Sequence, residues 1–408
     1  MIKVNKPKIR FNEFENTWIK SKLGELYEVY SGNTPSRSDS RNYQNGEIPW
    51  IKTTDLNNSI IYANEEKISV YGATKLKVLP EKSVLIAMYG GFNQIGRTGL
   101  LAYPATINQA LAALMPVNEI NPNFLLNFLN FKKESWRNVA ASSRKDPNIT
   151  KNDVEKLIIS FPSLDEQSAI GSLFRTLDDL LVSYKDNLTN YQSLKATMLS
   201  KMFPKAGQTF PDIRLDGFED EWEKGTIGEF GSFYYGKSAP KWSVTDDATT
   251  PCVRYGELYT KFSTKIDKIY SYTSIPKENL KLSSGNEVLV PRVGENPLDF
   301  ANCSWLSLKG VAIGEMISVY NTPNNPLFIA YYFNAKMKKE FAKRVEGGSV
   351  ANLYYTYLEN ISISVPSLPE QQAIGAYFSN LDNLISAHQE KIFQLETLKE
   401  KLLQDMFI

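Results

Sequence analysis

Apolar residues recur at steps of three and four along two long stretches of the chain, and this spacing predicts amphipathic helices. The stretches run from Ser163 to Phe203 and from Ser367 to Phe407. At about 1.5 Å of rise per residue, each helix would be roughly 55–60 Å long. The predicted stripes comprise Ile170, Phe174, Leu177, Leu181, Tyr184, Leu188, Tyr191, Leu194, Met198 and Met202 in the first stretch, and Ile374, Phe378, Leu381, Ile385, His388, Ile392, Leu395, Leu398, Leu402 and Met406 in the second.

The two stretches are copies of each other, 204 residues apart and aligned without a gap. A proline precedes each copy, Ser163 and Ser367 are N-cap candidates, and Glu166 and Glu370 follow three residues later, which predicts a capping box. Two interpretations are open for the stripes. Each could pack on its own neighbouring block, or the two could pair. We expect pairing, because two matched stripes within one chain can bury each other as a coiled coil.

The residues before each helix form a block of short β-branched or aromatic segments, bounded by Gly, Pro and Asn, which predicts strands and hairpins. Such segments include Ile48–Leu56 and Val84–Gly91, with counterparts at Thr250–Leu258 and Val288–Glu295. The blocks also share single landmarks, since Arg10, Phe14, Trp18, Gly24 and Gly32 match Arg214, Phe218, Trp222, Gly228 and Gly236.

Little else between these landmarks matches, so one scaffold is used twice with different surface residues. The predicted fold class is α+β. The expected domains are a first block at residues 1–161, a first long helix and linker at 162–207, a second block at 208–365 and a second long helix at 366–408.

Composition adds little to this picture. The chain has 408 residues with 46 basic and 45 acidic side chains, so any basic surface must be local. No apolar run reaches the ~18 residues of a membrane span, and the N-terminus lacks the apolar core of a signal peptide. The only cysteines are Cys252 and Cys303, which need not be bridged. A cytoplasmic protein is therefore expected.

Motifs that could carry catalysis are weak. Asn121–Phe124 looks like the Asn-Pro-Pro-aromatic site of amino-methyltransferases, but its third residue is wrong, and Asn325–Phe328 departs at the same place. We interpret both as helix caps, with Asn at the N-cap and Pro at the first helical position. His388 is the only histidine, so neither a zinc cluster nor a nucleophile–base pair is expected. No phosphate-binding G-x-x-x-x-G-K-[ST] loop occurs. We therefore predict no catalytic, metal or cofactor site in this chain.

What remains is a set of polar, basic and aromatic residues on loops that differ between the blocks. Arg, Lys, Asn and Gln can make paired hydrogen bonds to base edges. The candidate DNA contacts are Arg37, Lys52, Thr53, Asn93, Gln94, Arg97, Arg144 and Lys145 in the first block, and Lys237, Lys241, Arg254, Tyr255, Arg292 and Asn296 in the second. The same loops carry Arg41, Thr54, Asn108, Gln109, Ser143, Trp242, Glu257, Glu295 and Asn352. Of these, Lys52, Arg97, Arg254 and Arg292 are the favoured contacts.

The order of block, helix, block and helix, with the paired openings PSLDEQSAIG and PSLPEQQAIG, resembles the specificity subunit of a type I restriction–modification system. The resemblance covers essentially the whole chain. It implies two target-recognition domains, each reading half of a bipartite DNA site. It also implies an antiparallel coiled coil, formed by the two long helices, that spaces the domains.

By the same resemblance, the coiled coil docks two methyltransferase subunits, which bind S-adenosylmethionine. Motor–nuclease subunits with ATP and Mg²⁺ would join for cleavage. On the coiled coil, the resemblance and the stripes together assign partner contacts to Ile170, Phe174, Leu177, Leu181, Leu188, Ile374, Phe378, Leu381, Ile385 and Ile392. The second block departs from the first where Trp50 becomes Cys252.

Two other functions are kept as alternatives. A self-sufficient DNA methyltransferase or nuclease would need a cofactor site that the sequence does not reveal. A coiled-coil scaffold that never touches nucleic acid would need only the helices. Binding of S-adenosylmethionine by the isolated chain would identify the first, and failure to shift random duplex at low salt would identify the second.

Overall fold

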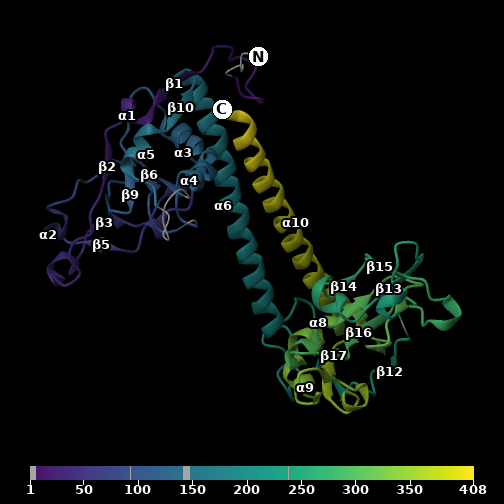
Figure 1. Cartoon of the computed structure of the whole chain (residues 1–408). Helices are drawn as coiled ribbons and strands as arrows, with labels where there is room; N and C mark the ends of the chain where they lie inside the picture. Colours follow the sequence, from purple (N-terminus) through teal and green to yellow (C-terminus); the bar gives the residue numbers. More distant parts are fainter. Residues whose placement is uncertain (1–5, 92, 141–147, 238) are drawn as a thin grey trace. The chain divides into compact units, whose positions relative to one another are not determined.

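The computed structural model of the chain describes residues 6–91, 93–140, 148–237 and 239–408. Contacts divide the chain into two compact units, which we name the first unit and the second unit. The first unit comprises Met1–Asp186 with Glu390–Ile408, and the second comprises Asn187–Gln389. Each unit therefore contains one block together with parts of both long helices (Figure 1).

The first unit is built on a five-stranded sheet of order β2-β9-β6-β7-β4 and a three-stranded sheet of order β5-β3-β8. The strand β6, Val84–Ala87, is buried at all four positions, as expected for a uniformly apolar strand inside a sheet. The remaining bounds are β2 Val29–Ser31, β9 Leu111–Leu114, β7 Thr98–Leu101, β4 Ser59–Ile61, β5 Lys67–Ile68, β3 Ile48–Ile51 and β8 Thr106–Ile107. A separate pair, β1 Ile19–Lys22 and β10 Ile158–Phe161, joins the start of the block to its end.

The second unit repeats this plan with sheets of order β12-β20-β16-β18-β14 and β15-β13-β19, and it adds a small sheet, β17-β22-β21. The strand pair β11 and β23 corresponds to β1 and β10. The bounds are β11 Glu223–Thr226, β12 Ser232–Tyr235, β13 Thr250–Val253, β14 Lys265–Ile266, β15 Ser271–Thr273, β16 Glu287–Pro291, β17 Val293–Gly294, β18 Ser304–Leu306, β19 Ala312–Ile313, β20 Ile317–Asn321, β21 Glu346–Gly347, β22 Ala351–Asn352 and β23 Ser362–Val365.

Three of the four segments predicted as strands are strands only in their first halves, whereas in Val288–Glu295 the strand β17 follows β16 after a single residue. After β3 and after β13 the chain turns into the short helices η2, Thr53–Asp55, and α7, Glu257–Thr260. The other short helices are α1 Leu23–Leu26, α2 Val70–Ala73, α4 Lys133–Ala140, α5 Lys151–Lys156, α9 Lys338–Ala342, η1 Ser40–Asn42, η3 Lys241–Ser243, η4 Lys277–Asn279, η5 Pro297–Ala301 and η6 Tyr355–Tyr357.

Two equivalent helices, α3 and α8, begin at the Asn-Pro motifs. They span Pro122–Phe131 and Pro326–Lys336, and the side chains of Asn121 and Asn325 accept hydrogen bonds from the backbone of their first turns. The helix-cap interpretation is therefore confirmed. Among the described residues, no helix is both long and apolar enough to cross a membrane.

The predicted long helices are present as α6, Leu164–Lys201, and α10, Leu368–Met406. They pair in opposite directions, drawn in teal and yellow in Figure 1. In the first unit Lys399 of α10 bonds Asp178 of α6, and in the second unit Lys195 of α6 bonds Asp382 of α10. These bonds are equivalent under the repeat, so the expected antiparallel coiled coil is confirmed.

The alternative interpretation of the stripes also holds in part, because the first half of each helix packs on its own block. Ile374, Phe378 and Leu381 belong to the core of the second unit. Further along, Leu194 and Leu398 are 38% and 44% exposed, so the predicted stripe is wrong at these two positions. The next residue in each helix is the lysine that bonds to the partner helix, and it takes the inward position instead.

The first turn of each long helix is fixed by a buried glutamate. Glu166 accepts two hydrogen bonds from the Arg10 guanidinium at 2.7 Å, and Glu370 accepts the same pair from Arg214 at 2.8 and 2.7 Å. Both carboxylates are 1% exposed. They therefore join the helix to the segment that enters the block and do not supply the glutamate half of the predicted capping box. The serine half is present at Ser163, whose Oγ accepts from the backbone N–H of Glu166 at 3.5 Å.

The neighbouring glutamine continues this connection. Gln167 Oε1 accepts from the backbone N–H of Asn121 at 2.8 Å, and Gln371 does the same for Asn325 at 2.8 Å. The side-chain amide of Gln167 donates to Pro162 at 2.9 Å. The doubled Glu-Gln therefore ties each long helix to the block before it and to the start of α3 or α8.

An aromatic residue at the end of each long helix enters the core of a block. Phe203 packs among aromatic rings of the second unit, with centroid distances of 5.7 Å to Phe328 and 5.8 Å to Phe378. Phe407 packs at 5.4 Å from Phe124 and 5.8 Å from Phe174 in the first unit. Each block is thus closed by the last turn of the long helix that belongs to the other copy of the repeat.

In each unit, three strand ends meet one turn of the backbone. In the second unit this turn is Gly314–Met316, and Gly236, Gly314 and Arg292 donate backbone hydrogen bonds to Ile317, Val253 and Met316 respectively, at 3.0, 3.0 and 3.1 Å. In the first unit the turn is residues 108–110, which the ends of β2, β3 and β6 approach in the same way. We name these the 314–316 turn and the 108–110 turn.

A glycine allows the closest of these approaches. A Cβ atom added to Gly32 would lie 1.9 Å from the carbonyl oxygen of Ile107, and one added to Gly236 would lie 2.1 Å from that of Gly314. No Cβ atom fits at such distances. The two glycine landmarks in the sequence are therefore explained by the packing of the strand ends.

We expect Glu370→Gln to lower the free energy of unfolding by about 3–5 kcal/mol, because it leaves the buried Arg214 charge without its counterion. Glu400→Gln, on an exposed position of the same helix, makes the same chemical change and should stay within about 0.5 kcal/mol of the wild type. Urea unfolding of both variants measures the difference. Equal midpoints would show that the ion pair contributes no stability.

We expect Gly236→Ala to destabilise the second unit by about 1–3 kcal/mol, because the new methyl group forces the 314–316 turn outward. Gly256→Ala is the matched control. Its backbone is already helical, with φ −63°, and no atom lies within 4 Å of the added Cβ. The control should be neutral or stabilising by up to about 1 kcal/mol. Thermal or urea unfolding of the two variants would contradict this argument if both lost stability equally.

Candidate nucleic-acid interface

In each unit, one strand that ends beside the strand-end turn is followed directly by a basic residue. That residue opens a loop whose backbone is capped by a carboxylate. Lys52 follows β3 and its backbone N–H donates to Asp55 at 2.7 Å, while Arg254 follows β13 and donates to Glu257 at 2.9 Å. Glu257 is buried and also accepts from Ser271 Oγ at 2.6 Å. A carboxylate thus fixes the backbone of each loop, whereas the side chains of Lys52 and Arg254 are only partly buried.

In the first unit, two of the predicted cations share one carboxylate. Arg37 Nη1 lies 2.5 Å from Glu66 Oε1, and Lys52 Nζ lies 2.6 Å from Glu66 Oε2. The hydrogen bond from Arg37, supported by Lys52, holds the pKa of Glu66 below its usual range. The Arg37 guanidinium also lies over the rings of Tyr43 and Trp50, at 4.3 and 5.4 Å. The cluster therefore presents an ordered surface with one positive charge in excess.

In the second unit, Arg292 follows β16 directly. Its guanidinium lies over the rings of Tyr235 and Tyr354, at 4.3 and 5.4 Å. Its Nε atom is buried and has no hydrogen-bond partner among the described residues. The equivalent position in the first unit is Met88, which is buried and apolar. The two units therefore share a backbone and differ in the chemistry they present at this point.

The other predicted residues are less uniform. Asn93, Gln94 and Arg97 lie on the connection between β6 and β7, where Arg97 Nε donates to the carbonyl of Asn93 at 3.0 Å. Asn296 caps η5 by accepting from the backbone of Leu298 at 3.2 Å, so its oxygen already has a partner.

Several predicted residues are exposed or lie beyond the described parts of the chain. Lys237, Lys241 and Tyr255 are exposed, and Thr53 at the start of η2 is partly buried. Arg144 and Lys145 lie outside the described residues.

Sequence reasoning missed the residues that position these cations. Glu66 directly precedes β5, far along the chain from Arg37, and Tyr354 lies more than sixty residues after Arg292. Neither stands in a motif, so no local pattern identifies them. The only available signal was the repeated glycine at Gly32 and Gly236, which marks the place where the strand ends meet.

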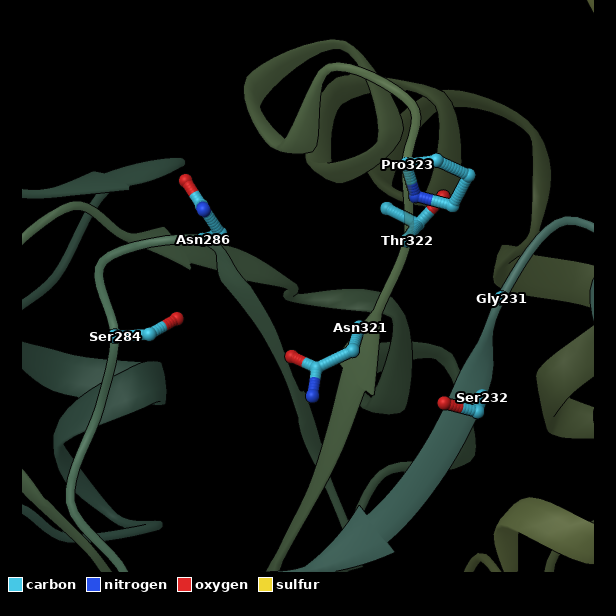
Figure 2. A pocket seen from close by; sticks show the side chains of 7 residues that line it. All are labelled: Gly231, Ser232, Ser284, Asn286, Asn321, Thr322 and Pro323. Atoms are coloured by element: carbon cyan, nitrogen blue, oxygen red, sulfur yellow. The ribbon is translucent and has the colours of Figure 1, made fainter.

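A hollow at the opposite end of the large sheet of the second unit provides a contrast. It has a volume of about 400 Å³, and the residues that line it are Gly231, Ser232, Ser284, Asn286, Asn321, Thr322 and Pro323 (Figure 2). All are uncharged. The nearby backbone N–H groups of Ser284, Gly285 and Asn286 already donate to the buried Glu287 carboxylate at 2.6, 3.0 and 3.0 Å. These three backbone groups are therefore not available to an anion.

The two cysteines and the histidine are not placed for catalysis. Both cysteines are free and buried, and burial raises the pKa of Cys252 to about 11, which keeps the thiol protonated. His388 packs against Tyr191 on the coiled coil, at 5.1 Å between ring centroids. Within the described ranges, no group of three or more His, Cys, Asp or Glu side chains could hold a metal ion. The strand-end clusters are instead suited to binding, with stacked cations and hydrogen-bond donors.

Comparison with known proteins agrees with this chemistry. The model of the type I restriction modification DNA specificity domain matches residues 15–214 and again residues 219–397. The chain is 23% identical over 403 residues to the specificity subunit of the type I restriction enzyme MjaIX from Methanocaldococcus jannaschii, covering 95% of this chain and 91% of that one. It is 22% identical over 413 residues to the MjaVIII specificity subunit of the same organism, with the same coverage.

Among solved structures, the S subunit of a type I restriction–modification system from M. genitalium has a similar fold. The TM-score is 0.64, with 16% sequence identity and coverage of 99% of both chains. The specificity-domain model matches both halves of the sequence, and each matched half includes a block with its capped loop and strand-end turn. The chain therefore belongs to the type I restriction–modification DNA specificity family, whose members recognise the DNA target and leave catalysis to partner subunits.

Proposed function

We propose that this chain reads a bipartite, asymmetric DNA site, with one half-site for each block. The observation that carries the proposal is the strand-end turn, which is built twice on the same backbone with different side chains around it. A symmetric dimer would read a palindrome, because the symmetry of a DNA site mirrors that of the protein. Lys52 against Arg254, and Met88 against Arg292, break the symmetry at equivalent positions.

The partners follow from the same proposal. Two methyltransferase subunits with S-adenosylmethionine would modify the site, and motor–nuclease subunits with ATP and Mg²⁺ would cleave unmodified DNA in the cytoplasm. The long helices support docking, because their outer faces carry exposed apolar residues such as Val182 and Phe393. The buried stripe residues hold the helix pair together and would act on docking only through its shape.

The helix pair is also the proposed spacer. Two equivalent ion pairs, Lys195–Asp382 and Lys399–Asp178, fix the register of the antiparallel helices. Both are mostly withdrawn from solvent, which makes a slip of the helices costly. A rigid spacer would set the number of base pairs between the half-sites.

The alternative functions are not favoured. A coiled-coil scaffold that never touches nucleic acid does not account for two matches to a DNA specificity domain. A self-sufficient methyltransferase does not account for them either. A gel-shift with random duplex at low salt remains a simple test of the scaffold alternative.

We expect the blocks to be separable readers. Replacing residues 1–160 with the equivalent block of a relative should change one half of the methylated motif and leave the other half intact. The reason is that each strand-end turn is completed by residues of its own unit. Sequencing of modified adenines in cells carrying the complete system measures this. A simultaneous change of both halves would refute modular reading.

We expect the helix pair to act as a ruler. Inserting four residues near Asn190 and four near Gln394 adds about 6 Å and about 40° beyond a full turn. One base pair spans about 3.4 Å and roughly 35°, so the preferred gap should grow by one or two base pairs. Methylation mapping gives the gap directly. Alanine at the exposed Asn187, Asn190 and Gln192 changes no length and serves as the control. An active insertion variant with the original gap would show that the helices are only a tether.

A further inference from the structure

Arg292 is held at both ends of its peptide unit. Its N–H donates to the carbonyl of Met316 at 3.1 Å, and its own carbonyl accepts from Leu353 at 2.8 Å. The residue therefore joins the 314–316 turn to the strand β22 region. Because the backbone of Arg292 is fixed on both sides, its side chain leaves the backbone in a defined direction.

The guanidinium is then confined by aromatic rings. It lies 4.3 Å from the centroid of Tyr235 and 5.4 Å from that of Tyr354. Tyr235 in turn packs on Tyr355 at 4.6 Å, and Tyr355 stacks on Phe233 at 5.4 Å with an interplanar angle of 5°. Rings over the face of a guanidinium leave its N–H groups, which lie in the plane, free to donate from the edge.

Among the residues that the structure describes, none pairs with the Arg292 guanidinium. The Nε atom is buried without a hydrogen-bond partner, and in the part of the chain that the structure describes no carboxylate is within ion-pair distance of this guanidinium. Arg37 of the first unit, also stacked on aromatic rings, is instead paired with Glu66. The buried Nε atom is out of a ligand's reach, so the two Nη groups are the donors that a ligand would use.

The comparison between the two units favours a base contact at this position over a phosphate contact. The phosphate backbone is the same in both half-sites, so a phosphate contact made by the shared scaffold is expected to use a cation in both units. The first unit has Met88 there, which cannot bind phosphate. A planar fork with two parallel donors matches the O6 and N7 acceptors of guanine in the major groove.

We propose that Arg292 reads a guanine in the half-site of the second block, by donating two hydrogen bonds to its O6 and N7 atoms. This inference rests on the proposed function. Tyr235 and Tyr354 are positioning residues, which hold the guanidinium in one plane without touching the base. Met88 presents no such donor, so the first half-site has no guanine read from this position.

The first test is the methylated motif in cells that carry the complete system. The wild type should require guanine at one position of the second half-site, identified by exchanging the block of residues 1–160. Arg292→Ala and Arg292→Gln should relax that position alone, reducing the preference for guanine by about 5- to 150-fold. Tyr235→Phe keeps the ring and should keep the motif, whereas Tyr235→Leu should weaken the preference for guanine only.

The second test uses purified complex and synthetic duplexes. Replacing the guanine with 7-deazaguanine removes the N7 acceptor and should weaken binding by the wild type several-fold. The Arg292→Ala complex should bind both duplexes equally. If the Arg292→Ala variant melts at a lower temperature than the wild type, Arg292→Met replaces it in both tests. Methionine keeps an apolar stem between the rings.

Three results would overturn the assignment to Arg292. The second half-site could contain no required guanine, the motif of the Arg292 variants could be unchanged, or their affinity could fall equally for cognate and random duplexes, as expected for a phosphate contact. Failure of the proposed function gives a different result. In that case the wild-type complex itself would bind its methylated motif no better than random duplex.

Discussion

A buried ion pair fixes the position at which each long helix leaves its block. Glu166 and Glu370 are almost completely withdrawn from water, and each accepts two hydrogen bonds from one guanidinium. Desolvating a carboxylate is costly, and the bidentate geometry with Arg10 or Arg214 offsets that cost. The same arginine also donates to a backbone carbonyl six residues along its own segment, Asn16 or Asp220. The segment that enters the block and the helix that leaves it are therefore held as one piece.

The rest of each unit depends on that piece. With the helix start fixed, the adjacent glutamine reaches the N-terminus of α3 or α8, and the apolar face of the helix lies against the core. The other long helix then returns in the opposite direction. Its terminal phenylalanine, Phe203 or Phe407, packs in the aromatic core of the unit. Stability of each unit thus comes from both copies of the repeat. The strand-end turns lie on this framework.

Much of this framework could be predicted from the sequence, because its signals are local or repeated. The periodic stripes predicted both long helices, and Asn121 and Asn325 predicted the starts of two further helices, α3 and α8. The stripe failed at Leu194 and Leu398 because apolar spacing alone does not reveal a lysine whose ammonium reaches an aspartate on the partner helix. The glutamate half of the capping box failed for a similar reason, since the side chain of Glu166 bonds Arg10, which is far away in sequence.

The recognition surface was less predictable. Arg37, Lys52 and Arg292 were selected by residue type, but their partners Glu66 and Tyr354 come from distant segments. Whether a loop arginine is paired or available is decided by those partners. A single sequence carries no pattern for contacts of that kind, so it could not separate Arg37 from Arg292.

The capped loops after β3 and β13 have a consequence for how such a protein changes over time. Asp55 and Glu257 hold the backbone of each loop through hydrogen bonds. Lys52 also pairs with Glu66, whereas no ion pair among the described residues involves the side chain of Arg254. A point substitution at Arg254 therefore alters what its loop presents at little cost in folding free energy. Under the proposed function, target preference and foldability would then be encoded by separate residues in this loop. New specificities could arise by single substitutions there, along a path on which every intermediate protein still folds.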